Sequence, residues 1–277
     1  MDARGALKVL VTGADGQLGR SFRPISSGFE RFDFSFAGRG DLDLANWRDT
    51  ASFFAEKPFD IVINCAAYTA VDLAETERKA AYIGNVTTAK HLVEACKKYA
   101  MRLVHYSTDY VFDGKKNQPY RETDTPNPIN YYGYSKWLGE QVIQQSGIDF
   151  YLFRTAWLYS GYGKNFVKTL IHRARTQVEL QVVNDQKGCL TEASWLVAQT
   201  LKALQWGLPF GLYHLCGGKP QTRYEIAREI AAEVNPQCCV KPIETKDLNP
   251  GAKRPKYSVL DTAKYDASLH EHRLSRR

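Results

Sequence analysis

The sequence predicts an α/β fold, a doubly wound parallel sheet with a smaller C-terminal lobe. Short apolar runs of strand length alternate with amphipathic segments of helix length over the first 160 residues, which is typical of a parallel sheet with helices on both faces. A glycine-rich turn follows the first run, and polar connections become longer after about residue 160. We therefore expect one large domain over residues 1–160 and a lobe over residues 161–277.

The expected strands are apolar, β-branched runs bounded by turn residues. Apolar residues at helical spacing predict helices over residues 80–99 and 132–144. A further strand near residues 180–185 lies beyond the change of pattern, and we expect it to return to the sheet of the first domain. The predicted strands are Lys8–Thr12, Phe32–Phe36, Ile61–Ala67, Leu103–Thr108, Phe150–Ala156 and Leu180–Asn184.

Composition excludes several classes of protein. The chain has 277 residues, of which 44% are hydrophobic, and a net charge of +7 that is spread along the sequence. It has no apolar run of about 20 residues that would span a membrane, and no signal-peptide pattern, so we expect a cytoplasmic protein. Six scattered cysteines without CxxC spacing are expected to be reduced, and we expect no metal. We expect no nucleic-acid partner, because a dispersed charge suits an anionic small molecule equally well.

A GxxGxxG turn follows the first strand, and it predicts a dinucleotide site. Gly13 permits the tight turn, Gly16 lets a pyrophosphate approach the backbone, and Gly19 lets the helix pack closely on the strand. The backbone N–H groups of Gln17 and Leu18 then lie at a helix N-terminus, which favours phosphate. We therefore expect a Rossmann-type NAD(P) domain, with the C-terminal lobe covering the substrate.

The end of the second strand bears on the choice between NADPH and NADH. An NAD enzyme usually has an acidic residue there to bind the ribose 2′-hydroxyl, whereas this chain has Arg39. An arginine can pair with the 2′-phosphate of NADP, so the sequence favours NADPH and leaves NADH open. Asp43 and Leu44 follow and are expected beside the adenine.

A YxxxK element provides the candidate catalytic residues. Tyr132 and Lys136 are separated by one helical turn and therefore share one face of the predicted helix. A nearby ammonium stabilises a phenolate and lowers the pKa of the tyrosine, and the same lysine can reach the nicotinamide ribose. Thr108 lies at the end of the fourth strand, at the sheet edge where ligands bind in such folds. We expect Thr108 to hold a substrate carbonyl that Tyr132 protonates.

With these residues, the sequence resembles the dTDP-4-dehydrorhamnose reductase family of extended short-chain dehydrogenase/reductases. The similarity covers nearly the whole chain. The segments that carry it are Val11–Gly19, Ile63–Asp72, Ser107–Gly114, Asn130–Lys136, Arg154–Trp157, Gly163–Phe166, Val183–Gln186 and Lys253–Pro255.

This resemblance implies a function and a set of site residues. The implied reaction is reduction of the C4 ketone of a nucleotide-linked 4-keto-6-deoxy sugar by NADPH or NADH, most simply dTDP-4-dehydro-L-rhamnose to dTDP-L-rhamnose. It implies Thr108, Tyr132 and Lys136 as the catalytic set. It also implies cofactor contacts from Ala66, Ala67, Tyr68, Thr69 and Asn85, and substrate contacts from Val71, Thr108, Asp109, Tyr110, Trp157 and Asn165.

The sequence also departs from the family pattern. Leu73 replaces a lysine, Leu190 replaces a proline, and the segment at Gln221–Tyr224 lacks the usual aromatic residue before the tyrosine. The tail after Asp261 is short and basic, and we expect no apolar helix there. Sugar-nucleotide dehydratases have an acidic residue at the position of Tyr110, so the resemblance disfavours that reaction.

Two alternatives stay open. One is a non-catalytic NADP-binding subunit similar to the regulatory subunit of methionine adenosyltransferase, although the retained Thr108, Tyr132 and Lys136 argue against it. The other is a reductase for a different 4-keto-6-deoxy sugar nucleotide or for the opposite C4 epimer. The oligomeric state is also open, with a homodimer among the candidates.

Overall fold

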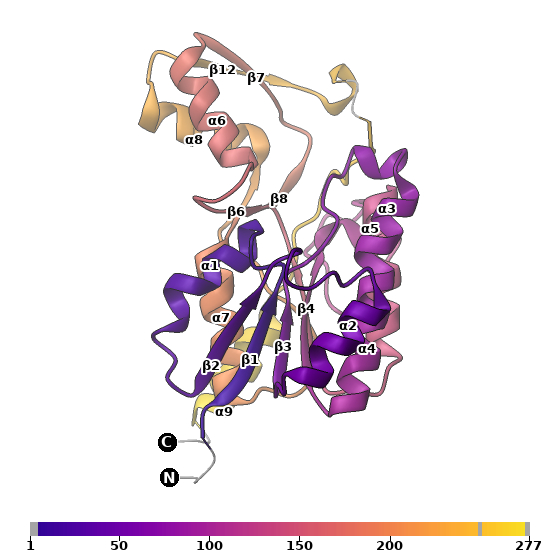
Figure 1. The fold of residues 1–277 in the computed structure, drawn as a ribbon. Coiled ribbons are helices and arrows are strands. Elements are labelled where there is room, and N and C mark those ends of the chain that lie inside the picture. The colour runs from indigo at the N-terminus through magenta and orange to yellow at the C-terminus, as the bar shows by residue number, and fades with distance from the viewer. Residues whose placement is uncertain (1–4, 249–250, 275–277) are drawn as a thin grey trace.

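The computed structural model describes residues 5–248 and 251–274. Its centre is a six-stranded, all-parallel sheet in the order β2-β1-β3-β4-β5-β10 (Figure 1). The predicted fold class is therefore confirmed. The strand order reverses between β1 and β3, and ligands bind outside the carboxyl ends of the strands at such a switch point. The strands are β1 (Leu7–Thr12), β2 (Phe32–Ala37), β3 (Ile61–Asn64), β4 (Arg102–Thr108), β5 (Phe150–Thr155) and β10 (Gly211–His214).

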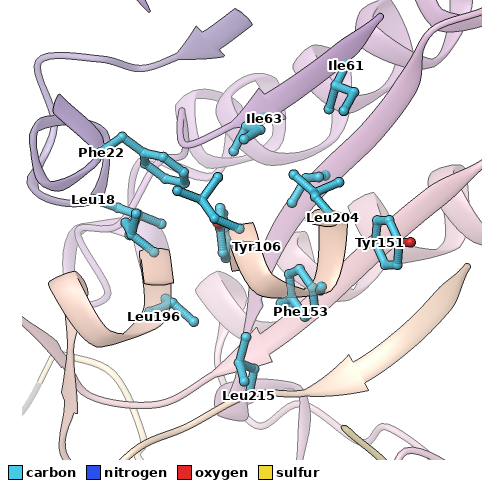
Figure 2. Packing of buried hydrophobic residues seen from close by; sticks show 14 of the residues in the cluster. Leu18, Phe22, Ile61, Ile63, Tyr106, Tyr151, Phe153, Leu196, Leu204 and Leu215 are labelled. Carbon is cyan, nitrogen blue, oxygen red and sulfur yellow. The ribbon is translucent and has the colours of Figure 1, made fainter. Parts of the chain in front are cut away.

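Alternating residues of these strands pack against two layers of helices. Val9 and Ile63 face α1 (Gln17–Ser26), α7 (Ala193–Trp206) and α9 (Ala263–Leu274). Leu10 and Val62 face the other layer, which is α2 (Trp47–Glu56), α4 (Thr88–Tyr99) and α5 (Tyr131–Gln144). Burial on both faces explains why the strands are nearly continuous apolar runs. Figure 2 shows the first layer, with Leu18, Phe22, Leu196 and Leu204 of the helices against Ile61, Ile63, Tyr106, Tyr151 and Phe153 of the strands.

A smaller lobe lies above the carboxyl ends of the strands (Figure 1). It consists of α6 (Phe166–Thr176), α8 (Arg223–Val234) and the parallel pair β7 (Glu179–Val183) and β12 (Cys239–Ile243). Leu170, Leu180 and Ile226 are buried in its own apolar cluster. Two short strand pairs lie in the segments that join the lobe to the sheet. They are β6 (Leu158–Tyr159) with β9 (Thr191–Glu192), and β8 (Lys187–Cys189) with β11 (Pro220–Thr222).

One expectation for the C-terminal half is wrong. The strand near residues 180–185 does not return to the central sheet, because β7 pairs with β12 and packs Leu180 against the lobe helices. Instead, β10 becomes the sixth strand by pairing with β5. As expected, no apolar helix follows Asp261 in the described part of the tail: residues 263–274 form α9, a mostly polar helix in which Tyr265 alone is deeply buried against the sheet, with Leu269 beside it. Residues 161–248 and 251–274 therefore contribute to both the lobe and the body of the molecule.

The remaining elements are short. They are 3-10 turns at Leu73–Glu75, Asp109–Val111 and Thr245–Asp247, helix α3 (Arg78–Tyr82) and a π-helical turn at Ile83–Thr87 that leads into α4. Within residues 5–248 and 251–274, no helix is both long and apolar enough to cross a membrane. The cytoplasmic localisation and the homodimer stay predictions.

Candidate active site

A cavity of about 500 Å³ lies between the carboxyl ends of the strands and the lobe. Its volume is in the range usual for small-molecule sites. Most residues predicted for the site from the sequence line it: Gly16, Gln17, Leu18, Ala67, Thr69, Val71, Thr108, Asp109, Tyr110, Tyr132, Lys136, Trp157 and Asn165. The others do not line it: Gly13, Gly19, Arg39, Asp43, Leu44, Ala66, Tyr68 and Asn85.

The turn after β1 is shaped to accept a phosphate group. Gly13 has a φ of +62°, and a Cβ there would lie 2.5 Å from the backbone nitrogen of Ala66, so only glycine fits. The N-cap residue of helix α1 is Gly16, which has no side chain to cap the helix N-terminus. Uncapped N–H groups beside a cavity are the usual anchor of a cofactor pyrophosphate, and these residues therefore fit a dinucleotide.

The segment after β2 is placed away from the cavity. Arg39 is exposed directly beyond the end of β2. Asp43 accepts a hydrogen bond from the backbone of Ala45 at 3.1 Å, and Leu44 is buried with its carbonyl oxygen 2.8 Å from Nδ1 of His91. This segment adjoins the glycine turn through the β1–β2 pair, so its adenosine contacts stay a prediction.

Several contacts fix the first turn of α5, which carries Tyr132 and Lys136. Asn130 caps the helix by accepting a hydrogen bond from Gly133 N at 2.7 Å, and it donates one to Lys253 O at 2.8 Å. Glu75 accepts a hydrogen bond from Tyr131 N at 2.8 Å. The hydrogen bonds of Asn130 and Glu75 therefore fix the start of α5, and with it the positions of the two candidate catalytic residues.

Lys136 is buried and lines the cavity. Its Nζ donates a hydrogen bond to Tyr106 O at 2.6 Å and lies 3.3 Å from Nε2 of His105. Burial lowers the pKa of Lys136 to about 8, although the negative charge of Glu140 opposes the shift. The ammonium form therefore still predominates at neutral pH.

Tyr132 lies on the same helical face, beside Tyr110, with ring centroids 6.0 Å apart in an edge-on arrangement. Burial raises the pKa of its phenol, a hydrogen bond with Thr108 opposes the shift, and the charge of Asp109 adds to it. The charge of Lys136 does not contribute to this shift, so the expected lowering of the Tyr132 pKa by Lys136 is not found in this structure. A raised pKa keeps the phenol protonated at neutral pH, which is the form that a proton donor needs.

Thr108 and Asp109 are polar residues that interact with Tyr132 and with each other. The Thr108 hydroxyl donates to Asp109 Oδ1 at 3.0 Å and accepts from Tyr110 N at 3.2 Å. Burial raises the pKa of Asp109 to about 6, and the neighbouring hydroxyls of Ser258 and Thr108 and the charge of Arg223 oppose the shift. The site therefore contains a carboxyl group that titrates just below neutral pH.

Four buried polar atoms have no hydrogen-bond partner within the described part of the chain. They are Ser107 Oγ, Asp109 Oδ2, Thr155 Oγ1 and Trp157 Nε1, and all four residues line the cavity. Trp157 also has a φ of +42°, which is costly for a bulky residue. Native proteins rarely leave buried polar groups unpaired, so this concentration indicates a place where a polar ligand supplies the missing partners.

Two predicted contact residues have structural hydrogen bonds instead of free polar groups. The Asn85 side chain donates to Tyr68 O at 3.1 Å and to Ser135 Oγ at 2.9 Å, and it accepts from Tyr68 N at 3.0 Å. Both of its N–H groups are thus used to fix the loop that contains Tyr68. Asn165 caps α6 and donates to Gln17 Oε1 at 2.9 Å, so it connects the lobe to the glycine turn.

Comparison with known proteins identifies the family. The RmlD substrate binding domain model matches residues 7–275. A dTDP-4-dehydrorhamnose reductase of Burkholderia thailandensis is 35% identical over 274 residues, with 92% of this chain and 90% of that protein covered. The chain belongs to the dTDP-4-dehydrorhamnose reductase family.

Two further relatives extend this result. The spore coat polysaccharide biosynthesis protein SpsK of Bacillus subtilis is 37% identical over 255 residues, covering 91% of this chain and 88% of that one. A crystal structure of the dTDP-4-dehydrorhamnose reductase of Bacillus anthracis in complex with NADP superposes with a TM-score of 0.90 at 33% identity, covering 98% and 99% of the two chains. Membership in the dTDP-4-dehydrorhamnose reductase family confirms the predicted family and the oxidoreductase class.

The structure adds site residues that sequence reasoning missed. His105 and Asn64 lie inside buried strands. Asn64 Nδ2 is 3.0 Å from His105 Nδ1, and the other ring nitrogen of His105 contacts Lys136 Nζ. Their signal in the sequence is a polar residue within an otherwise apolar strand. Lys164, Phe166 and Arg223 line the cavity from the lobe. In the described residues, no group of three His, Cys, Asp or Glu side chains could hold a metal ion.

Proposed function

We propose that this protein reduces the C4 ketone of dTDP-4-dehydro-L-rhamnose with NADPH, giving dTDP-L-rhamnose. The observation that carries the proposal is the convergence of a protonated phenol, a buried lysine and four unpartnered polar atoms on one cavity beside the glycine turn. Names of relatives at 35% and 33% identity support the substrate and the cofactor.

The chain's own residues have separable tasks in this reaction. The N-terminus of α1 and the turn at Gly13 would hold the cofactor pyrophosphate, and Lys136 its ribose. When bound, the nicotinamide cofactor supplies the hydride that reduces the ketone. Tyr132 donates its proton to the C4 oxygen, and the charge of Lys136 stabilises the phenolate that results. Thr108 orients the same oxygen, and the Trp157 indole lies beside the sugar.

Turnover with a defined product tests this proposal. Purified protein is incubated with dTDP-4-dehydrorhamnose and NADPH, oxidation is followed by absorbance, and the product is identified by NMR. Tyr132→Phe should lose more than about 100-fold in kcat, because it lacks the general acid. The matched control is Tyr134→Phe, on the same helix but 41% exposed, which should turn over normally.

The assay also separates the alternatives. NADPH binding without turnover would contradict the proposal and favour a non-catalytic subunit. Turnover of a different 4-keto-6-deoxy sugar nucleotide, or the opposite C4 configuration in the product, would favour a related reductase. The similarity to a spore coat polysaccharide protein is the observation that favours considering a related reductase as the second alternative.

Cofactor preference gives one further prediction. Arg39→Ala should raise the KM for NADPH about 10-fold and leave the KM for NADH unchanged, because only NADPH has a 2′-phosphate to pair with the guanidinium. The control is Arg48→Ala, another exposed arginine on the neighbouring α2. Equal changes for the two cofactors would remove the case for Arg39.

A further inference from the structure

Arg223 is a lobe residue whose side chain lies against the cavity. Its guanidinium stacks on the Trp157 ring, 4.2 Å from the centroid, and lies 4.8 Å from the centroid of Phe166. Its Nε donates to Gln186 Oε1 at 3.1 Å. Two aromatic faces and one hydrogen bond therefore hold the group in a single orientation.

The residue that orients Arg223 is itself anchored. Gln186 is buried, with only 3% of its surface exposed. Its Nε2 donates to Thr245 Oγ1 at 2.9 Å, and that hydroxyl donates to Asp185 Oδ1 at 2.6 Å. A side chain supported in this way is preorganised, as residues of binding sites usually are.

The two terminal nitrogens of Arg223 have no such partners. Across residues 5–248 and 251–274, they make no hydrogen bond, and no carboxylate lies within ion-pair distance of them. Arg223 is also the first residue of α8, where the helix dipole disfavours a cation. The position therefore does not stabilise the helix, and an unpaired cation at a cavity wall is instead available to a ligand.

The charges around the cavity favour an anionic ligand. Asp109 is the acidic residue among those that line it, whereas Lys136, Lys164 and Arg223 are basic. Lys136 belongs to α5, and the other two belong to the lobe. A fork of two N–H donors on a planar group matches two oxygens of a phosphate.

We propose that Arg223 binds the diphosphate of the nucleotide-linked sugar and so determines affinity for the nucleotide part of the substrate. This inference rests on the proposed function, which supplies a substrate with a diphosphate. The stacking on Trp157 places the cation beside the indole that lines the sugar subsite. Arg223 is then a substrate-binding residue and has no part in the proton transfer.

Binding of dTDP tests the proposal without turnover. Calorimetry with Arg223→Gln should show a dTDP Kd raised about 10-fold or more, the usual effect of losing charged hydrogen bonds. Thymidine, which has no phosphate, should bind the variant as it binds the unchanged protein, and the NADPH Kd should stay within about twofold. The control is Arg228→Gln, which removes the same charge from an exposed position on α8.

The outcomes separate this inference from alternatives. An unchanged dTDP Kd in Arg223→Gln, with a lower kcat, would overturn it and show that Arg223 acts only by orienting Trp157. If Arg223→Gln does not fold, Arg223→Lys replaces it, and its dTDP Kd should rise at least threefold because the fork is lost. dTDP binding that depends on Arg223, without reduction of any keto sugar, would contradict the proposed function and support the anion site.

Discussion

Two regions around β4, β5 and α5 contain buried charged side chains, and these are paired with opposite charges in only one of the two regions. Arg154 on β5 forms a bidentate ion pair with Glu140 on α5, at 2.9 and 2.6 Å. On the cavity side, Lys136 on α5 and Asp109 after β4 have no opposite charge within ion-pair distance in the described residues. Their pKa values are shifted by burial toward the neutral forms.

The difference shows how one helix combines stability with chemistry. The Arg154–Glu140 pair fixes α5 on the sheet, four residues beyond Lys136. The cavity side keeps charges that cost free energy in the folded state, and the proposed ligand binding and proton transfer would use them. We therefore expect substitutions in the two regions to change stability in opposite directions.

Breaking the paired region should have the largest effect. Arg154→Met leaves Glu140 as a buried uncompensated charge, which should lower the free energy of unfolding by about 3–5 kcal/mol. Urea denaturation at pH 7 measures this. The double variant Arg154→Met with Glu140→Leu should recover most of the loss. A cost below about 1 kcal/mol in the single variant would mean that the pair does not fix α5.

Removing the buried lysine should act in the other direction. The pKa of Lys136 is about 8 in the folded protein, against 10.5 for an ordinary lysine, so below pH 8 the folded state bears the cost of a buried charge. Lys136→Met should then raise the free energy of unfolding at pH 7 by on the order of 3 kcal/mol while abolishing turnover.

The pH dependence checks the sign of this effect. Between about pH 8 and 10.5 the unfolded chain binds more protons than the folded one, so the stability of the unchanged protein rises and the advantage of Lys136→Met disappears. Urea denaturation at pH 7, 9 and 10 tests this. Lys97→Met, at an exposed position on α4, should show no such trend. A constant difference across this range would contradict the assignment.

Neutralising the acid should have a somewhat smaller effect. The pKa of Asp109 is about 6 in the folded protein, against an ordinary value of 3.8. Asp109→Asn should therefore be more stable at pH 7 by on the order of 3 kcal/mol. This advantage should shrink as the pH falls from 6 to 3.8, because the folded state then gains a proton before the unfolded chain does. Thermal unfolding between pH 4 and 8 measures this advantage. The control is Asp33→Asn, at an exposed position on β2. Loss of stability at pH 7 would contradict it.

The smallest effect is expected from an unpartnered hydroxyl. Thr155→Val removes a buried Oγ1 without a hydrogen bond, so the free energy of unfolding should change by less than about 0.5 kcal/mol. The same substitution at Thr200, whose hydroxyl bonds with Tyr106 at 2.8 Å and Leu196 O at 2.9 Å, should cost about 1–2 kcal/mol. Equal costs at the two positions would show that Thr155 has a partner in solution.

Much of the body could be predicted from the sequence, because each signal is local. Five strands of the sheet follow from apolar runs, and Tyr132, Lys136 and Thr108 follow from spacing and strand ends. The choice between β7 and β10 as the sixth strand could not be predicted. Both are short runs, of five and four residues, and which strand each one pairs with is decided by tertiary packing.

Residues of the site differ in the same way. Asn85 has the residue type of a cofactor contact, but its hydrogen bonds become visible only once Tyr68 and Ser135 are placed around it. Arg223 left a trace in the sequence, since a cation directly after the capping residue Thr222 opposes the helix dipole. Its stacking on Trp157 joins residues distant in the chain, so only the fold reveals it.

The path of the chain between body and lobe has a consequence for synthesis on the ribosome. Helix α7, formed by residues 193–206, covers the apolar sheet face that contains Val9 and Ile63, and it is made only after α6 and β7 of the lobe. A nascent chain that has emerged only as far as residue 160 therefore exposes to water the part of this face that α1 does not cover. Premature termination at that point should yield an aggregating fragment, and folding to the native state must wait until most of the chain has left the exit tunnel.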